Sequence, residues 1–190
     1  IAIGEDSVSS ETNAVALGVD SGATAEGAIA VGQRTTSSGV RGVALGAFST
    51  AEGADSVAIG TDALSRFENG IAIGDLTQTE GIKAIALGNE SSAFSDRSIV
   101  VGNNTFAGGL AAHAIGDNTQ ADGAGAIAIG SDGVDSDSEG AEATADGAIA
   151  IGQDALASGQ GGIAVGQLAL AQDEVSLAIG TTARAIGAAS

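Results

Sequence analysis

The feature that most constrains the fold is a four-residue pattern, apolar-Ala-apolar-Gly, which returns at a fixed spacing. The pattern reads IAIG at residues 71–74, and similar tetrapeptides precede and follow it. The closing glycines lie 14 residues apart from Gly4 to Gly130 and again from Gly152 to Gly180. A fixed short period indicates a repeat architecture in which each unit stacks on its neighbours. We therefore expect one repeat domain over residues 1–190.

Within each repeat the residues alternate in a way that predicts strands. Counted from the closing glycine as offset 0, offsets 11 and 13 hold branched aliphatics, and offset 12 is almost always alanine. Offsets 3 and 5 hold small residues, such as Ser49 and Ala51. A period of two and β-branched enrichment are typical of strands. Two strands and two turns in each repeat predict an all-β parallel solenoid, whose coils stack about 4.8 Å apart.

The alternation also suggests how the coils associate. If the aliphatic residues at offsets 11 and 13 fill the coil, the alanines at offset 12 point outward in one row. An exposed row of small apolar residues on a thin solenoid favours parallel association with identical chains. The alternative is that alanine simply fits a tight pleat beside solvent. The predicted interface residues are Ala16, Ala30, Ala44, Ala58, Ala72, Ala86, Ala128, Ala150, Ala164 and Ala178.

One interruption of the period suggests a cation site. The glycines Gly130 and Gly152 are 22 residues apart, so eight extra residues lie within 131–142. This acidic segment contains Asp135, Asp137 and Glu139, followed by glycine. Oxygen ligands at the first, third and fifth positions and glycine at the sixth resemble the opening of a calcium loop. The alternative is a solvated acidic loop that binds no cofactor.

Charge limits the classes of partner. The net charge is −18, with only six lysines and arginines, which argues against binding to nucleic acids or to anionic membranes. Three of the basic residues, Arg41, Lys83 and Arg97, share offset 9. Lys83 and Arg97 are in consecutive repeats and are predicted to form a small ligand-binding patch. The alternative is that these residues merely occupy a turn.

The remaining polar residues do not indicate an enzyme. Cysteine is absent, and the single histidine, His113, takes the place of an aliphatic residue at offset 11. His113 is interpreted as a filler of one coil or as a pH-sensitive interface residue. Carboxylates recur at turn positions, where turn chemistry explains them. Because the sequence begins and ends within the repeat pattern, we expect a fragment of a longer protein.

The iterated motif, from residues 1–4 to residues 177–180, resembles the YadA-like head of trimeric autotransporter adhesins. The resemblance implies a left-handed parallel β-roll, assembled as a parallel homotrimer. It also implies display on a bacterial surface, with outer-membrane anchoring through a stalk and anchor outside this fragment. Heads of this family bind extracellular matrix such as collagen, or other cells and surfaces. His113, Arg184, the insertion and the strong acidity depart from the family pattern.

These observations favour an adhesin head that attaches through many weak contacts. One alternative is a non-adhesive structural spacer in a surface or phage-tail fibre. Another is an ice- or mineral-binding solenoid, which requires a regular polar row. Threonine occurs only sporadically at offset 3, which weakens this last alternative; the residues are Thr35, Thr77, Thr105 and Thr119.

Overall fold

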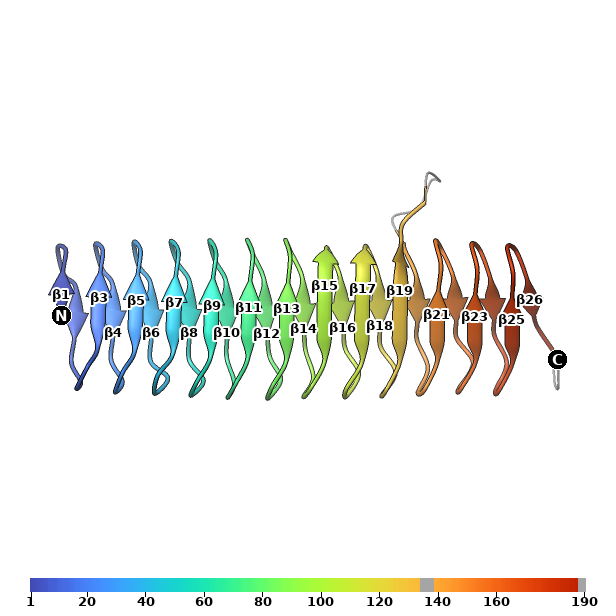
Figure 1. Ribbon diagram of the computed structural model, residues 1–190, viewed down its shortest axis with the longest axis horizontal. Helices are drawn as coiled ribbons and strands as arrows, with labels where there is room; N and C mark the ends of the chain where they lie inside the picture. Colours follow the sequence, from blue (N-terminus) through green and yellow to red (C-terminus); the bar gives the residue numbers. More distant parts are fainter. Residues whose placement is uncertain (134–138, 188–190) are drawn as a thin grey trace. The chain divides into compact units, whose positions relative to one another are not determined.

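The chain forms short β-strands joined by tight turns (Figure 1). The computed structural model describes residues 1–133 and 139–187, and strands are the only regular elements in these ranges. In the same ranges, no helix is long and apolar enough to cross a membrane. The chain divides into two compact units, Ile1–Ser92 and Ala93–Ser190. In each unit the odd-numbered strands form one parallel ladder, the first ladder, and the even-numbered strands form the second ladder.

The strands of the first unit follow the repeat without interruption. Its first ladder contains β1 (Ala2–Ile3), β3 (Val15–Leu17), β5 (Ile29–Val31), β7 (Val43–Leu45), β9 (Val57–Ile59), β11 (Ile71–Ile73) and β13 (Ile85–Leu87). Its second ladder contains β2 (Val8–Ser9), β4 (Gly22–Ala23), β6 (Thr36–Ser37), β8 (Thr50–Ala51), β10 (Leu64–Ser65) and β12 (Gln78–Thr79). Strand β14 (Ser92–Ala93) spans the division between the two units.

The second unit continues the same alternation of strands. Its first ladder contains β15 (Ile99–Asn103), β17 (His113–Asp117), β19 (Ile127–Ser131), β21 (Ile149–Ile151), β23 (Ile163–Val165) and β25 (Leu177–Ile179). Its second ladder contains β16 (Phe106–Ala107), β18 (Gln120–Ala121), β20 (Glu142–Ala143), β22 (Leu156–Ala157), β24 (Leu170–Ala171) and β26 (Arg184–Ala185).

The register of both ladders is the sequence period. Ile73 of β11 pairs with Ile59 of β9 and with Leu87 of β13, so each residue lies beside its equivalent 14 positions away. Where the insertion occurs, Ile127 of β19 instead pairs with Ile149 of β21. The extra residues therefore leave the ladder intact. The predicted parallel β-solenoid of 14-residue coils is confirmed.

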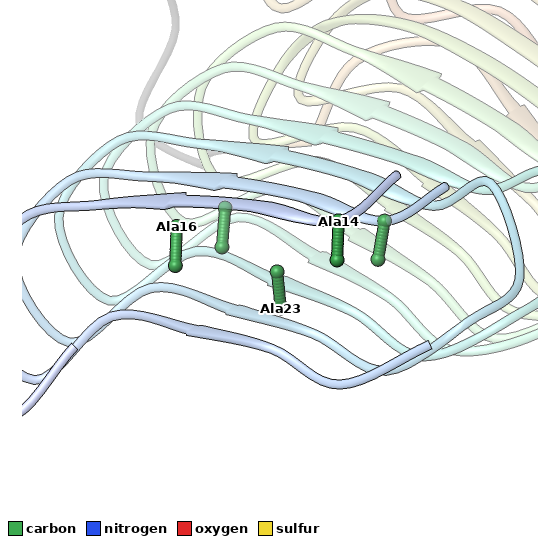
Figure 2. Packing of buried hydrophobic residues seen from close by; sticks show 5 residues of the cluster. Ala14, Ala16 and Ala23 are labelled. Carbon is green, nitrogen blue, oxygen red and sulfur yellow. The ribbon is translucent and has the colours of Figure 1, made fainter. Parts of the chain in front are cut away.

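The predicted direction of the side chains, in contrast, is wrong. The ten alanines assigned to an outer interface lie inside the coil, and each is at most 3% exposed. They are Ala16, Ala30, Ala44, Ala58, Ala72, Ala86, Ala128, Ala150, Ala164 and Ala178. In Figure 2, Ala14 and Ala16 project from the first ladder toward the second, and Ala23 projects back toward them. The aliphatic residues at offsets 11 and 13 are the ones that face outward, as Ile71 and Ile73 do in β11.

The reason for this reversal is the small space between the ladders. Offsets 10 and 12 of the first ladder meet offsets 3 and 5 of the second, and all four carry small residues. Examples are Ser56 and Ala58 facing inward from around β9, and Ala63 and Ser65 from around β10, each fully buried. Methyl and hydroxyl groups fill the interior, whereas an isoleucine there would overpack it.

The closing glycines are required where one coil crosses the next. Gly60 has φ +133°, a region that side chains other than glycine rarely adopt. A β-carbon on Gly60 would lie 2.1 Å from the carbonyl oxygen of Gly74 in the neighbouring coil. Neither backbone can move away without breaking the ladder hydrogen bonds on either side, such as Gly60 N to Leu45 O at 2.8 Å. The glycine column therefore sets the distance at which coils stack.

We expect Gly60→Ala to lower the free energy of unfolding by about 3 kcal/mol, through backbone strain and the clash with Gly74. The matched control is Gly22→Ala, because a β-carbon at Gly22 meets no atom within 4 Å. The control should change stability by less than about 1 kcal/mol. Chemical denaturation at one protein concentration measures both variants. Equal effects at the two glycines would contradict the close approach at the turn.

Candidate interaction surface

The outer side of the first ladder is an apolar face. The side chains at offsets 11 and 13 project from it, and we call them the aliphatic face. In β11 the exposed fraction of Ile73 is 39%, and Ile71 is half-buried. The same residue types recur on each neighbouring strand of a unit, so the apolar surface is continuous along that unit. A continuous exposed apolar surface is typical of a protein–protein contact site, whereas single exposed apolar residues are common on any protein.

His113 is the polar exception on the aliphatic face. It begins β17 at offset 11, half-buried, and pairs in register with Ile99 on one side and Ile127 on the other. Its imidazole therefore sits in a row of isoleucines, on the outer side of the ladder. His113 therefore does not fill the coil, as one interpretation had it, and its role as a pH-sensitive interface residue stays a prediction.

The outer side of the second ladder is chemically varied. Offset 4 carries valine, glycine, threonine, leucine, glutamine and serine in the first unit, and phenylalanine, glutamine, glutamate, leucine and arginine in the second. Near the end of the second unit lies an open depression of about 390 Å³, whose lining includes Leu156, Leu168, Leu170, Asp154 and Arg184. This surface has no single chemical character, so it suits selective contacts better than self-association.

The three predicted basic ligand residues occupy the same turn position of their repeats. Arg41, Lys83 and Arg97 all have positive φ, between 56° and 60°, at offset 9. Arg41 and Lys83 belong to the first unit and Arg97 to the second. Arg41 is already paired, because its Nε and Nη2 donate to Asp55 Oδ1 and Oδ2 at 2.6 and 2.5 Å. A ligand-binding role for Lys83 and Arg97 stays a prediction.

The predicted calcium loop falls mostly outside the described residues. Asp135 and Asp137 lie outside them, whereas Glu139 is described and exposed. Among the described residues, no cluster of three potential metal-ligating side chains occurs. The ends of the insertion are anchored, since Gly133 N donates to Asp154 Oδ1 at 2.8 Å and Gly140 N donates to Asn118 O at 2.9 Å. Calcium binding stays a prediction.

The threonines considered for ice binding point into the coil. Each is at most 1% exposed; they are Thr35, Thr77, Thr105 and Thr119. Their hydroxyls bond to the closing glycine of the next coil, as Thr105 Oγ1 does to Gly116 O at 2.7 Å. These residues therefore satisfy turn carbonyls and cannot form an outward polar row.

Two aromatic contacts were missed in the sequence because the four phenylalanines occupy different offsets. The rings of Phe94 and Phe106 lie 5.8 Å apart between centroids and are tilted by 45°. In the first unit, the guanidinium of Arg34 lies over the ring of Phe48, 5.8 Å from its centroid. Phe94 and Phe106 are at offsets 6 and 4 of consecutive repeats. Both offsets are even, so both side chains point to the outer side of the second ladder. This signal in the sequence could have predicted the contact between the two rings.

The chain matches the family model described as "YadA head domain repeat (2 copies)". The matched residues are 1–21, 9–35, 23–49, 37–63, 51–77, 68–91, 80–105, 107–132 and 143–169. Among solved structures, it is similar to the collagen-binding domain of the Yersinia adhesin YadA, with 27% identity and a TM-score of 0.60. That similarity covers 71% of each chain. No curated protein sequence matches the chain.

The Arg41–Asp55 pair gives a testable electrostatic effect. The hydrogen bond from Arg41 holds the pKa of the Asp55 carboxyl below its ordinary value, against the smaller opposing effect of desolvation. In Arg41→Gln we expect this pKa to rise toward the ordinary value of a free aspartate. A carboxyl NMR titration measures the change, and Lys83→Gln, which removes a charge at the same turn position, should leave Asp55 nearly unaffected.

The sign of the pH effect follows from the lowered pKa. The pair stabilises the fold above the unfolded-state pKa of Asp55, and this contribution is lost as pH falls through the folded-state value. Because both side chains are exposed, the contribution is small. An Asp55 titration that is the same in Arg41→Gln and in the unmodified chain would contradict the ion pair.

Proposed function

This chain belongs to the family of YadA head domain repeats, and from that membership we propose that it is an adhesive head that binds extracellular matrix such as collagen. Members of this family are bacterial surface proteins. The supporting observation is the similarity to the collagen-binding domain of YadA, which extends over 71% of this chain. Outer-membrane attachment through segments beyond residues 1–190 is part of the same proposal.

The aliphatic face supplies the physical reason for a homotrimer. Isoleucine, valine and leucine side chains that cannot enter the coil remain on its outside, where contact with water is unfavourable. Identical chains carry identical faces, so association in parallel and in register buries the same residues on every chain. We propose three chains because the family forms trimeric heads. The ten inward-facing alanines have no part in this interface.

Adhesion by such a head is multivalent. A trimer presents three copies of every outer turn and of the second ladder's outer side. Once one copy binds a fibrous matrix protein, the others encounter it at high effective concentration. Weak single contacts then give strong overall attachment without a deep pocket. The rigid backbone ladder fixes the spacing between contacts, which limits the entropy lost on binding.

Self-association can be tested at the aliphatic face. We expect light scattering to give the mass of three chains for the unmodified protein, and of single chains for Ile73→Glu at micromolar concentration. Each buried, unpaired glutamate should cost about 3 kcal/mol in the trimer. The matched control is Thr61→Glu, at an exposed turn position, which should leave the mass unchanged. A single-chain mass for the unmodified protein would rule out the proposed interface.

The adhesive role can be tested with the same variants. We expect the unmodified protein and Thr61→Glu to bind immobilised collagen, and Ile73→Glu to bind at least about 100-fold more weakly, because avidity is lost with the trimer. Surface plasmon resonance measures the difference, with fibronectin and laminin as parallel surfaces. A protein that is trimeric but binds none of the three would instead be a structural spacer.

A further inference from the structure

The second unit carries an aromatic and acidic patch on the outer side of its second ladder. We call Phe94, Phe106, Gly108 and Asp122 the Phe94 patch. Phe94, Gly108 and Asp122 occupy offset 6 of three successive coils, and Phe106 lies at offset 4. Backbone hydrogen bonds hold these successive coils side by side: Phe94 N donates to Ala107 O, and Gly108 N donates to Ala121 O, both at 2.9 Å. Phe94 is 46% exposed.

Gly108 brings the ring and the carboxylate to one space. A β-carbon at Gly108 would lie 2.8 Å from Phe106 Cε1 and 3.1 Å from Asp122 Oδ1. The missing side chain therefore leaves room for the ring of Phe106 beside the backbone of Gly108, and the carboxylate of Asp122 approaches the same position. Asp122 Oδ2 accepts a hydrogen bond from Gln120 Nε2 at 2.5 Å, which fixes the carboxylate. Oδ1 is the carboxylate oxygen on the side of Gly108, and a carboxylate oxygen has two lone pairs that can accept hydrogen bonds.

The first unit contains the same combination with a cation already in place. Asp20, Arg34 and Phe48 occupy offset 2 of three successive coils. Arg34 Nε lies 3.5 Å from Asp20 Oδ2, and Arg34 Cζ lies 5.8 Å from the centroid of Phe48. In the Phe94 patch, an aspartate and a phenylalanine again lie two coils apart, about 10 Å at the spacing of parallel strands. Glycine takes the place of the arginine.

We propose that the Phe94 patch binds an arginine side chain supplied by a basic segment of a partner protein. The guanidinium bonds to Asp122 Oδ1 and lies against the aromatic rings, as Arg34 does between Asp20 and Phe48. Arginine suits the site better than lysine because its flat, weakly hydrated head both stacks on rings and bonds to carboxylates. The net charge of −18 attracts a basic partner over a longer range.

The patch is independent of the proposed trimer and of collagen binding. It lies outside the second ladder, whereas the aliphatic face lies outside the first ladder. Self-association through the aliphatic face therefore leaves the patch open to a partner. Its occupant is defined by charge and shape, so any extended basic segment that presents an arginine satisfies it.

The sequence makes the test direct, because the chain has four phenylalanines and no tyrosine or tryptophan. We expect titration with acetyl-Gly-Arg-Gly-Arg-Gly-amide to shift the aromatic NMR signals of Phe94 and Phe106, and to leave Phe67 unchanged. The same peptide with citrulline in place of arginine keeps the shape and loses the charge, and should cause no shift. Binding at one such site should be weak, with Kd about 1 mM.

Variants separate the site from general attraction to an acidic protein. We expect Asp122→Asn and Phe94→Leu each to weaken arginine-peptide binding about fivefold. The controls Asp62→Asn and Phe67→Ala, at exposed positions of the first unit, should leave the affinity unchanged. Phe94→Leu keeps an apolar side chain and removes the ring, so it isolates the aromatic contribution. Equal losses in Asp122→Asn and Asp62→Asn, or equal shifts with the citrulline peptide, would overturn the proposal.

Discussion

The close stacking of one coil on the next is the constraint on which the rest of the structure depends. Parallel hydrogen bonds join equivalent residues in successive coils, and the tight turns hold the two ladders near each other. Only small side chains fit between the ladders, and only glycine fits where Gly60 approaches Gly74. Bulky apolar side chains are therefore forced outward, and the exposed aliphatic face follows from the packing. The proposed self-association would remove this face from water.

The period of the sequence predicted the stacking and the register because both follow from repetition alone. It could not decide which face of each strand is inside, because alternation shows only which residues share a face. Large aliphatics are usually the core, and that general rule misassigned Ile73 and Ala72. The deciding observation was in the sequence: offset 10 shares its parity with offset 12 and holds Ala14, Gly42 and Ser56. A face of small residues on both strands leaves no room for isoleucine.

The contacts between side chains were only partly predictable. Equal offsets in consecutive repeats correctly imply neighbours, which is the relation between Arg41 and Asp55. Diagonal neighbours, such as Phe94 and Phe106, depend on rotamers and on the glycine at 108, which the repeat does not specify. The sequence could place the insertion between two repeats because the repeat resumes after it. The calcium site predicted in the insertion depends on side-chain positions, and the repeat pattern does not determine these.

The two outer faces are under different physical demands. Each residue of the first ladder's outer side has to pack against an identical chain in the proposed trimer, which favours one residue class throughout. Residues at offset 4 of the second ladder contact neither the lumen nor that interface. Phe106, Glu142 and Leu170 can therefore differ without disturbing the backbone ladder, in the same way that binding loops vary on a fixed scaffold. Selectivity for a partner can then change at little cost in stability. Recognition would use the outward side chains of the second ladder, whereas the packing of the coil uses the inward ones.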